Sequence, residues 1–500
     1  MTISPAQYTA WLAADGKARE VLIEVGCNHG GVEIVRYLSI YGRTTGPAES
    51  PPNTPYLSRL NGKISFSRKV SVTSTEPSVQ MQVSSIDLDN LDGDLDAWMD
   101  DVWEKRALRV YIGDPSWPRA DFRQILAGRV AALNPNGRSG LKLDFYDELL
   151  RLNCPVTEAT LGGTSSNKDA ILPVAFGEVF NVTPLLVDEG NHEYQVHNGQ
   201  IELFIEGRDN GAPASSTPNP AAGKFRLDQH PVGQITCDVQ GAKPGGVYAH
   251  TLASIVKDIV MSWGYPDTRL SIGEIDDVNF AAFDASNNQT LGLYLDGKTN
   301  VIDACNQLCS SLQASLYFSS AGLLRLWRPP ASAGAPMHVY TPGDIDPDSF
   351  EVVEIIPATP AVTLGWGRNW TVQSSGLAWG LPESAVDDLK LEWREYAVSD
   401  AAAVTLRRYT TRPTREDTLL VDESDAQVEA GKRLDFRRVP HKIVQFKTTL
   451  SALEHDIGTE ITIIYPRAGC ESGKSGWIIG VTPDLGMSDS PFRVLLEVLL

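Results

Sequence analysis

Short apolar segments rich in β-branched residues, each followed by Gly, Pro or Asn, recur along most of this chain and restrict its fold more than any other feature. In the first quarter they include EVLIEV, VEIVRYLSI, VQMQVSSIDL and ALRVYIGD. This pattern is typical of strands, because alternate side chains face a core and the punctuating residues turn the chain. With 42 Gly and 31 Pro in 500 residues, the chain has many such turns. We therefore expect a mainly β protein with α+β parts.

A few segments instead have helical signals. Ser4 and Gln7 form a capping box around Pro5, which predicts a short N-terminal helix that ends before Gly16. The apolar residues in HTLASIVKDIVMSWG (residues 250–264) recur with a period near 3.6, and KTNVIDACNQLCSSLQA predicts a second helix. A third, charged helix is expected in DESDAQVEAGKRLDFRRV, with Val428 and Leu434 on its inward face.

The length of the chain predicts several domains, since a single core seldom grows beyond roughly 250 residues. Shifts in the pattern divide it into an N-terminal β-barrel domain (1–155), a β-rich insertion (156–245), an α+β domain of two helices and a hairpin (246–335), a β-rich connecting region (336–425) and a second β-barrel domain (426–500). The expected fold class is thus two similar β-barrels with interposed β-rich and α/β domains.

The two barrels are expected to be similar because their hairpins resemble each other. The segment FRQILAGRVAALN is followed by LKLDFYDELL near the end of the first unit, with a turn predicted at Asn134-Pro135-Asn136-Gly137. At the C-terminus, GWIIGVTPDL is followed by FRVLLEVLL. In this alignment Gly128-Arg129-Val130 corresponds to Gly480-Val481. Each pair of segments has the pattern of a strand, a turn and a long strand.

The thiols do not have the pattern of a metal site. Six Cys are scattered through the chain without a CxxC pair, so reduced thiols are expected. Cys305 and Cys309 are four residues apart, but they share an apolar helical stripe with Val301, Leu308 and Leu312. Zinc would need two further ligands nearby, and none is close in sequence. We expect both thiols to be core residues, and we predict no metal or cofactor site.

The segment GCESGKSG, residues 469–476, resembles a phosphate-binding loop. The motif requires Gly one residue before Gly469, where the chain has Ala468, and a helix after the loop, where it has the strand-like WIIGV. A hairpin turn is therefore expected.

The segment DLDNLDGDLD, from Asp87 to Asp96, is rich in oxygen ligands. An EF-hand loop with Gly93 at its sixth position would start at Leu88 and end at Met99, neither of which suits calcium. We expect an Asx-rich turn instead.

No catalytic motif emerges from the remaining residues. The eight His (29, 192, 197, 230, 250, 338, 441 and 455) form no HExxH, and there is no GxSxG. His192 and His197 are expected to be surface or hydrogen-bonded residues. Glu392 and Glu395 have the spacing of a possible acid/base pair, but such pairs arise by chance among 63 acidic residues. We expect no catalytic residue and no enzymatic activity.

The charge and the N-terminal sequence disfavour a nucleic-acid-binding, secreted or membrane-spanning protein. A formal net charge of -20 without a basic cluster disfavours binding to a phosphate backbone. The N-terminus lacks the basic and apolar regions of a signal peptide, and no apolar run approaches 18 residues. We therefore expect a protein made in the cytoplasm that does not insert into a membrane.

Taken in order along the chain, these segments resemble the baseplate or tail-tip hub proteins of tailed bacteriophages. The resemblance is carried by SSIDLDNLDGDLDAWMDDVWEKRALRVYIGD, FRQILAGRVAAL, LKLDFYDELLRLNCPV, FGEVFNVTPLLVD, YQVHNGQIE, NVIDACNQLCSSLQASLYFSSAGLLRL and the C-terminal Gly-Val hairpin. It covers most of residues 20–330 and, more loosely, 425–500.

The resemblance implies a structural virion protein at the tail tip. Three copies would form a ring in which two barrels per chain present six similar surfaces, so that the ring adapts a six-fold tail tube to a three-fold tip. The implied partners are the distal tail and tail-tube proteins, the tape-measure protein and the tip or fibre proteins. DNA would pass through an acidic lumen without specific binding.

Two other functions fit a β-rich tail protein. A receptor-binding or adhesin-like protein is also trimeric but would bind host cells by itself. A phage polysaccharide hydrolase would degrade capsule or peptidoglycan.

Overall fold

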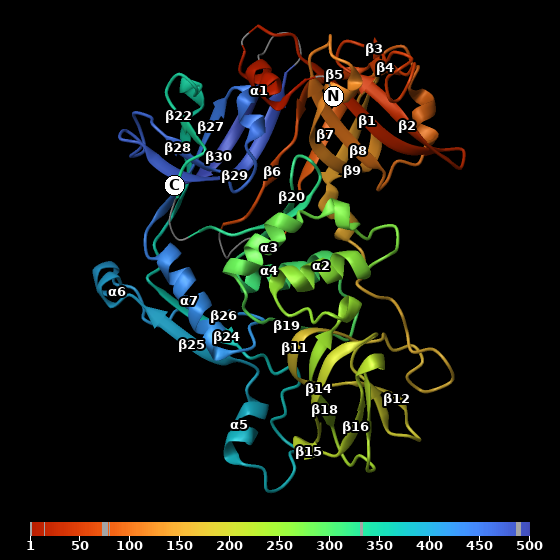
Figure 1. Cartoon of the computed structure of the whole chain (residues 1–500), viewed down its shortest axis with the longest axis vertical. Helices are drawn as coiled ribbons and strands as arrows, with labels where there is room; N and C mark the ends of the chain where they lie inside the picture. The colour runs from red at the N-terminus through yellow and green to blue at the C-terminus, as the bar shows by residue number, and fades with distance from the viewer. Residues whose placement is uncertain (1–2, 15, 73–78, 80, 331–333, 487–491) are drawn as a thin grey trace. The chain divides into compact units, whose positions relative to one another are not determined.

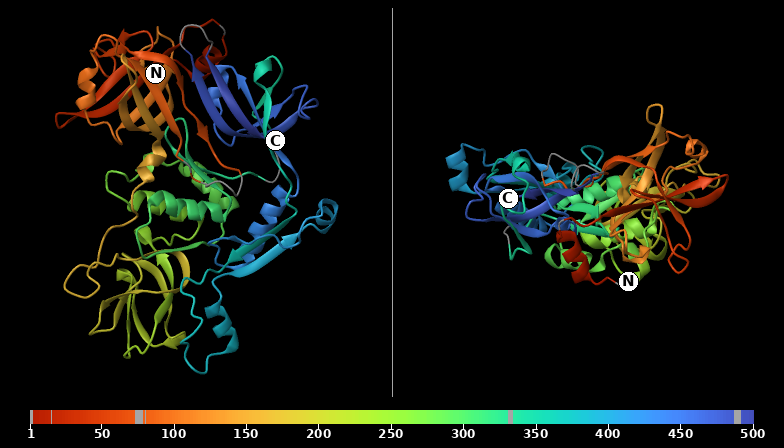
Figure 2. Two further views of the ribbon diagram at one scale, coloured as in Figure 1. Left: turned by 180° about the vertical axis from the view of Figure 1, so that it is seen from behind. Right: turned by 90° about the horizontal axis from the view of Figure 1, so that it is seen from above.

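The structure, a computed structural model, describes residues 3–14, 16–72, 79, 81–330, 334–486 and 492–500. The chain divides into two compact units. Unit 1 comprises Met1–Arg151, Tyr317–Ile356 and Pro440–Leu500, and unit 2 comprises Leu152–Leu316 and Pro357–Val439. Each unit thus combines stretches that are far apart in sequence, as the colours in Figure 1 and the views in Figure 2 show.

Unit 1 is built on a sheet of 16 strands. These are β1 (Glu20–His29), β2 (Val32–Ser39), β3 (Arg43–Thr44), β4 (Pro55–Ser58), β5 (Leu60–Ser65), β6 (Arg68–Lys69), β7 (Val83–Asp89), β8 (Ala107–Gly113), β9 (Arg123–Pro135), β10 (Gly140–Asp147), β22 (His338–Tyr340), β23 (Glu351–Ile356), β27 (His441–Thr448), β28 (Glu460–Ile463), β29 (Lys474–Leu485) and β30 (Arg493–Leu499). Their order is β23-β27-β30-β29-β5-β7-β10-β9-β8-β1-β2-β4-β3, with β28 and β6 also pairing with β29 and β22 pairing with β28. The mainly β fold is confirmed. Within the described residues the path of pairings is open, from β23 to β3.

The N-terminal helix of unit 1 forms as its sequence predicts. It is α1 (Pro5–Ala13), and it begins at Ser4, whose hydroxyl accepts a hydrogen bond from the N–H of Gln7. The Gln7 side chain in turn accepts from the N–H of Ser4, which completes the capping box. Tyr8, Trp11 and Leu12 are buried, so packing against the unit adds to the stability of this short helix.

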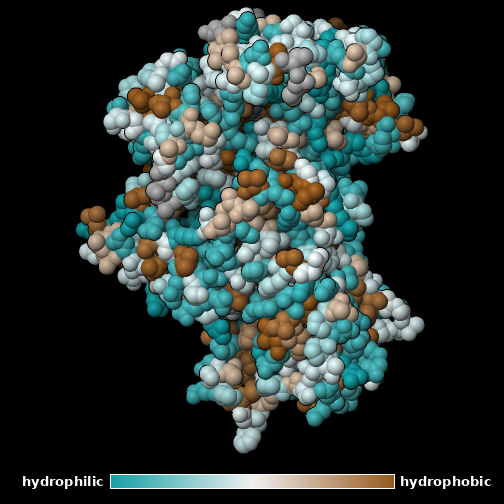
Figure 3. Space-filling view, viewed as in Figure 1, coloured by the Kyte–Doolittle hydropathy of each residue, from teal (hydrophilic) through white to brown (hydrophobic). Residues whose placement is uncertain are grey.

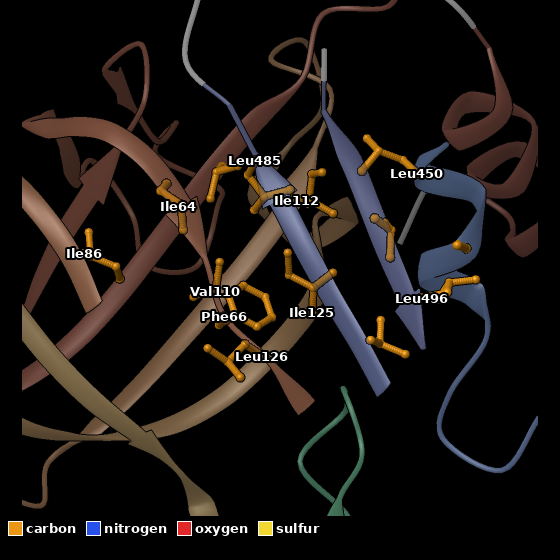
Figure 4. Packing of buried hydrophobic residues seen from close by; sticks show 14 of the residues in the cluster. Ile64, Phe66, Ile86, Val110, Ile112, Ile125, Leu126, Leu450, Leu485 and Leu496 are labelled. Atoms are coloured by element: carbon orange, nitrogen blue, oxygen red, sulfur yellow. The ribbon is translucent and has the colours of Figure 1, made fainter. Parts of the chain in front are cut away.

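The core of unit 1 is one cluster of apolar side chains from both ends of the chain. Figure 4 shows Ile64 and Ile112 near Leu485, and the same cluster extends to Leu450 and Leu496 on the other side of the view. All of these side chains are buried. Residues from the N-terminal and C-terminal thirds of the chain thus share one core.

Unit 2 contains three sheets. A five-stranded sheet has the order β15-β14-β18-β11-β19, a four-stranded sheet has the order β12-β13-β17-β16, and a three-stranded sheet has the order β25-β24-β26. Their strands are β11 (Val174–Val182), β12 (Leu185–Asp188), β13 (Glu193–Gln195), β14 (Ile201–Asp209), β15 (Ala212–Ala214), β16 (Ser216–Asn219), β17 (Lys224–Leu227), β18 (Ile235–Ala242), β19 (Gly292–Leu295), β24 (Ala361–Trp366), β25 (Arg394–Ser399) and β26 (Glu416–Asp417). A further hairpin of β20 (Ser315–Phe318) and β21 (Leu324–Trp327) lies where the chain passes from unit 2 to unit 1.

The helices of unit 2 include three that were expected and three that were not. The expected helices are α2 (Leu252–Ser262), α4 (Val301–Ser311) and α7 (Glu423–Arg437), and the others are α3 (Asp277–Ser286), α5 (Glu383–Lys390) and α6 (Ala401–Arg407). In α2 the predicted stripe is buried, including Ile255, Val256 and Ile259. The N-terminus of α3 is capped by Asp276, whose carboxylate accepts from the N–H of Asn279 at 3.0 Å. That cap was a local signal for a helix that sequence analysis missed.

The predicted inward face of α7 is wrong at Val428, while Leu434 is half-buried. Val428 is 52% exposed, while the buried positions are Ala426, Glu429, Ala430, Arg433 and Phe436. Burial of Glu429 and Arg433 is possible because the two side chains pair, with Arg433 Nε donating to Glu429 Oε1 at 2.8 Å. A buried ion pair thus replaces the expected apolar contact.

The sheet of unit 1 includes strands from more than one of the predicted domains. The domain boundaries themselves stay a prediction. Strands β22 and β23 fall in the region expected to connect domains, residues 336–425. Both pair with strands near the C-terminus: β22 with β28 and β23 with β27. The helix α7, expected in the second barrel, belongs to unit 2.

Candidate assembly interface

Unit 1 contains the same strand order twice. In the first half, β5, β7, β10, β9, β8 and β1 are consecutive neighbours, and in the second half β23, β27, β30, β29, β28 and β22 are. Each set also appears in the same order along the chain, from β1 to β10 and from β22 to β30. A 3₁₀ helix follows the second strand of the order in both halves. It is Asp96–Asp100 after β7 and Leu450–Glu454 after β27. The one difference in strand direction is that β22 is parallel to β28, whereas β1 is antiparallel to β8.

The two hairpins of this repeat match in detail. In the first, Ala132 is opposite Asp144 and Val130 is opposite Phe145, so that Ala131 is bulged out of register. In the second, Gly480 is opposite Glu497 and Ile478 is opposite Val498, so that Ile479 is bulged. A β-bulge is a specific local feature, and its occurrence at the same place in both hairpins sets their alignment.

This alignment confirms the similarity of the hairpins and corrects the register inferred from sequence. With Val130 equivalent to Ile478, Gly128 corresponds to Gly476 and not to Gly480. The shared Gly-Val pattern placed the two strands four residues out of register, because glycine and valine recur often in such strands. The bulge is a feature of pairing, which the sequence of one strand does not reveal.

One segment joins the two halves of the sheet. After pairing with β7, the chain leaves the first half and runs antiparallel to β29: Ser65 is opposite Asp484, Arg68 opposite Val481 and Lys69 opposite Gly480. The N–H of Val70 then donates to the carbonyl of Ile479 at 2.9 Å. The residues from 64 to 70 thus form a strand on β29 with a single continuous register.

Two ion pairs stabilise the pairing of residues 64–70 with β29, which is called the joint below. Arg68 Nη1 lies 2.5 Å from Asp456 Oδ1, with the arginine side chain only 5% exposed. Lys69 Nζ lies 2.8 Å from Glu497 Oε2, on the neighbouring strand β30. Because Arg68 is buried, its pairing with Asp456 favours this one arrangement of the two halves.

The strand that is equivalent to this joining segment has a free edge among the described residues. In that part of the chain, β23 pairs only with β27, and its side chains Val352, Val353 and Ile355 are 40%, 50% and 64% exposed. On the face drawn in Figure 3, apolar side chains gather in small patches among hydrophilic ones. An exposed apolar edge strand is a template for pairing with another chain, so β23 is a candidate assembly edge.

Sequence analysis missed this edge. EVVEII was included in a connecting region, although its β-branched residues were a signal for a strand. What the sequence could not show is that β23 lies at the end of a sheet, because that depends on which strand pairs with it.

The predicted core position of Cys305 and Cys309 is confirmed. Both lie on the buried face of α4, which packs on α2, and neither side chain is accessible to solvent. Burial raises the pKa of the Cys305 thiol to about 12 and also raises that of Cys309. All six thiols are buried and unpaired in disulfides. Within the described residues, no group of three His, Cys, Asp or Glu side chains is arranged to hold a metal ion.

The Asp-rich turn is held by hydrogen bonds and an arginine. Asp89 Oδ1 accepts from the N–H of Leu91 at 3.1 Å and Asp92 Oδ1 accepts from the N–H of Asp94 at 3.2 Å, which are the expected Asx turns. Arg59 lies 2.7 Å from Asp92 and 2.8 Å from Asp94. Its guanidinium lowers the pKa of the Asp92 carboxyl. The turn therefore already has a positive partner for two of its carboxylates.

The loop that resembles a phosphate-binding loop is a hairpin connection. It joins β28 to β29, with Ile463 opposite Lys474. Strand β29 begins at Lys474, so the loop is followed by a strand and not by the helix that the phosphate-binding motif requires. The prediction of a hairpin turn is confirmed.

A pocket with a volume of about 460 Å³ lies in unit 2. Its walls include His197, Asp258 and Trp263. His197 Nδ1 accepts from the N–H of Ala175 at 3.1 Å, and burial lowers the pKa of this imidazole to about 4. Asp258 accepts from Trp263 Nε1 at 3.4 Å, and burial raises the pKa of its carboxyl. His197 is thus a hydrogen-bonded residue, as predicted, and each group has its own partner in the protein.

The other candidate residues lie apart from this pocket. The rings of His192 and His230 on unit 2 lie edge to face, with centroids 4.9 Å apart, and the ring centroids of His338 and His455 on unit 1 are 5.3 Å apart. Glu392 and Glu395 are exposed and face different arginines, Arg368 at 3.7 Å and Arg415 at 3.3 Å. The structure does not bring these two carboxylates onto a common site.

Among the residues that the structure describes, no helix is both long and apolar enough to cross a bilayer.

No protein-family model matches the chain, and no curated protein matches it. Similar solved structures include a tail protein from Neisseria meningitidis MC58, with 10% identity, a TM-score of 0.42 and 97% of each chain covered. The 43 kDa tail protein of prophage MuSo2 from Shewanella oneidensis has 9% identity and a TM-score of 0.42, with 96% of this chain and 98% of that protein covered. A prophage tail protein from Listeria monocytogenes EGD-e has 9% identity and a TM-score of 0.39, with 96% and 94% covered. All three of these similar structures are tail proteins.

Proposed function

We propose that this chain is a structural protein of a phage tail and forms the trimeric hub at the tail tip. The observation that carries the proposal is the repeated strand order within one continuous sheet of unit 1. A chain with two similar halves presents two similar surfaces, and three such chains present six. A ring of this kind can contact a six-fold tube on one side and a three-fold tip on the other.

The proposed work of the hub is assembly and not catalysis. Extended strands supply main-chain hydrogen bonds and apolar contacts, which are sufficient for stable association. The partners would be tail-tube and distal tail proteins, the tape-measure protein and the tip or fibre proteins. The chain would be made in the host cytoplasm and located in the virion at the tail tip.

The charge supports a role in lining the DNA exit channel. A net charge of -20 repels a polyanion at any separation within a Debye length of roughly 8 Å, so DNA would pass without adhering. This part of the proposal requires that acidic side chains face the lumen of the assembled ring.

The test is the mass and the contacts of the purified full-length chain. Native mass spectrometry should give three times the 54.5 kDa of one chain, and the trimer should bind purified tail tubes. A stable hexamer, or a monomer that does not associate with tubes, would contradict the symmetry adaptor. Binding to host cells by the chain alone would favour the adhesin, and sustained hydrolysis of host polysaccharide that one carboxylate substitution abolishes would favour the hydrolase.

A further inference from the structure

In the joint between the two halves of unit 1, the segment 64–70 pairs with one edge of β29. Within the described residues, the equivalent edge of β9 has no such partner. One edge of β29 is shared by two segments: β28 covers it from Lys474 to Trp477, and the segment 64–70 covers it from Ile479 to Leu485. The other edge of β29 pairs with β30. Strand β29 therefore has both edges paired along nearly all of its length.

Strand β9 is the equivalent of β29, and part of its corresponding edge is free of described partners. Strand β8 covers this edge from Arg123 to Arg129, as β28 does on β29. Val130 then bonds to Arg106 and Lys105 through its main chain. From residue 131 to residue 135, no described residue pairs with β9 on this side. This free stretch is equivalent to the part of β29 that the segment 64–70 occupies.

Strand β23 is the equivalent of the segment that makes the joint. Ser65 is opposite Ser85 on β7, and Glu351 is opposite Gln445 on β27, at matching places in the repeat. In the first half this segment leaves β7 and pairs with β29, whereas β23 stays on β27 with its outer edge open. The described residues of one copy thus leave one free strand edge on β23 and one free receiving edge on β9.

We propose that β23 of one copy pairs antiparallel with residues 131–135 of β9 in a second copy, and that this pairing closes the ring. The proposal rests on the trimeric hub as the function of the chain. Its register follows from the joint within the chain: Lys69 is opposite Gly480, and the equivalents of these residues are Ile355 and Ala132. Ile355 of one copy therefore lies opposite Ala132 of the next.

This pairing determines the symmetry of the assembly. The two edges differ, so the contact is heterologous, and copies join head to tail. The joint between copies repeats the joint within each copy, so a closed ring of three chains has six similar joints. The pairing also occupies the free main-chain edge of β23, which would otherwise be prone to unspecific association.

The experiment is cross-linking between engineered thiols in the full-length chain. The six native thiols are buried, so the substitutions Ile355→Cys and Ala132→Cys together add the accessible pair. A short thiol-to-thiol cross-linker should convert most of the double variant into covalent dimers and trimers on a denaturing gel. Each single variant should stay at the mass of one chain, because a head-to-tail contact does not bring two copies of one position together. Ile355→Cys combined with Val32→Cys is the matched control, since Val32 is 61% exposed on another strand and should not cross-link.

The outcomes separate the pairing from the proposed function. Trimers by native mass, without a cross-link in the variant that combines Ile355→Cys with Ala132→Cys, would overturn the pairing and leave the trimeric hub standing. Cross-linked dimers from the Ile355→Cys variant alone would also overturn it, because they indicate a two-fold contact. Cross-linking of the double variant into open polymers or rings of another size would support the pairing and overturn the trimer. A chain that stays monomeric at every concentration and does not cross-link would overturn both.

Discussion

Gly128 on β9 and Gly476 on β29 occupy the same position in the two hairpins of unit 1. A Cβ atom at Gly128 would lie 2.6 Å from the carbonyl oxygen of Tyr146, and one at Gly476 would overlap the carbonyl oxygen of Leu499. Tyr146 and Leu499 are themselves equivalent in the repeat. In both halves, then, a carbonyl group of the second hairpin strand comes so close to the first strand that only glycine fits there.

We expect Gly128→Ala and Gly476→Ala each to destabilise the protein by at least about 2 kcal/mol, because the clash is with backbone and not with a movable side chain. Thermal unfolding of the purified variants measures the loss. Gly297→Ala is the matched control, since a Cβ there meets nothing within 4 Å and the change should be close to neutral. Two neutral variants at Gly128 and Gly476 would mean that the hairpins are not packed as described.

The buried His197 should make unit 2 less stable in acid. Its pKa in the folded protein is about 4, below the value of about 6.5 in an unfolded chain. The unfolded state therefore binds the proton more tightly, so this contribution is fully present above pH 6.5 and is lost as the pH falls from 6.5 toward 4. At pH 5 the loss is about 2 kcal/mol relative to neutral pH.

The measurement is chemical unfolding of the wild type and of His197→Asn at pH 7 and pH 5. Asn can accept the hydrogen bond from Ala175 without titrating, so the variant should lose less stability on acidification. His230→Asn, at an exposed position, should behave as the wild type does. An identical acid sensitivity in wild type and His197→Asn would contradict the assignment.

The ion pair on α7 should be costly to break from one side. Arg433→Met leaves Glu429, which is fully buried, without its guanidinium, and we expect a loss of about 3–5 kcal/mol. The double variant Glu429→Gln with Arg433→Met should recover more than half of this loss, because Glu429 no longer leaves a buried charge and Glu416 keeps its ion pair with Arg437. The exposed pair of Arg438 and Asp435 is the control: Arg438→Met should cost less than about 1 kcal/mol. Thermal unfolding of unit 2 reports all three variants.

The thiols should be inert in the folded protein. Because Cys305 and Cys309 are fully buried and their pKa values are raised, a thiol reagent should modify neither before unfolding and all six thiols after it. Replacing both by Ala should cost a few kcal/mol at most through lost packing. Zinc or iron found in stoichiometric amount by elemental analysis of the wild type, and absent from the double variant, would reverse this interpretation.

The Asp-rich turn should not depend on calcium. Arg59 already contacts Asp92 and Asp94, so neither millimolar calcium nor a chelator should shift the thermal midpoint of the wild type. Arg59→Met should cost less than about 1 kcal/mol, as for other exposed ion pairs. A saturable stabilisation by calcium that Asp92→Asn abolishes would show that the turn is a cation site.

The sequence alone determined the local structure of this protein. Alternating β-branched residues predicted the strands of the first unit, the capping box at Ser4 predicted α1, and the period of Ile255, Val256 and Ile259 predicted the buried face of α2. These features depend on neighbours within a few residues, so the chain carries their signals in one place. The similarity of the two hairpins was also evident, because both have the same alternation and turn.

Only the tertiary structure decided which segments meet. The register of the repeat depends on bulges at Ala131 and Ile479, which exist only when two strands pair. The inward face of α7 has Glu429 and Arg433 because their charges find each other and Glu416 in the folded chain, against the preference of charged groups for water. The free edges of β9 and β23 likewise depend on where the segment 64–70 pairs. Contacts between residues hundreds of positions apart have no local signal, since each is stabilised by a partner that the neighbouring sequence does not contain.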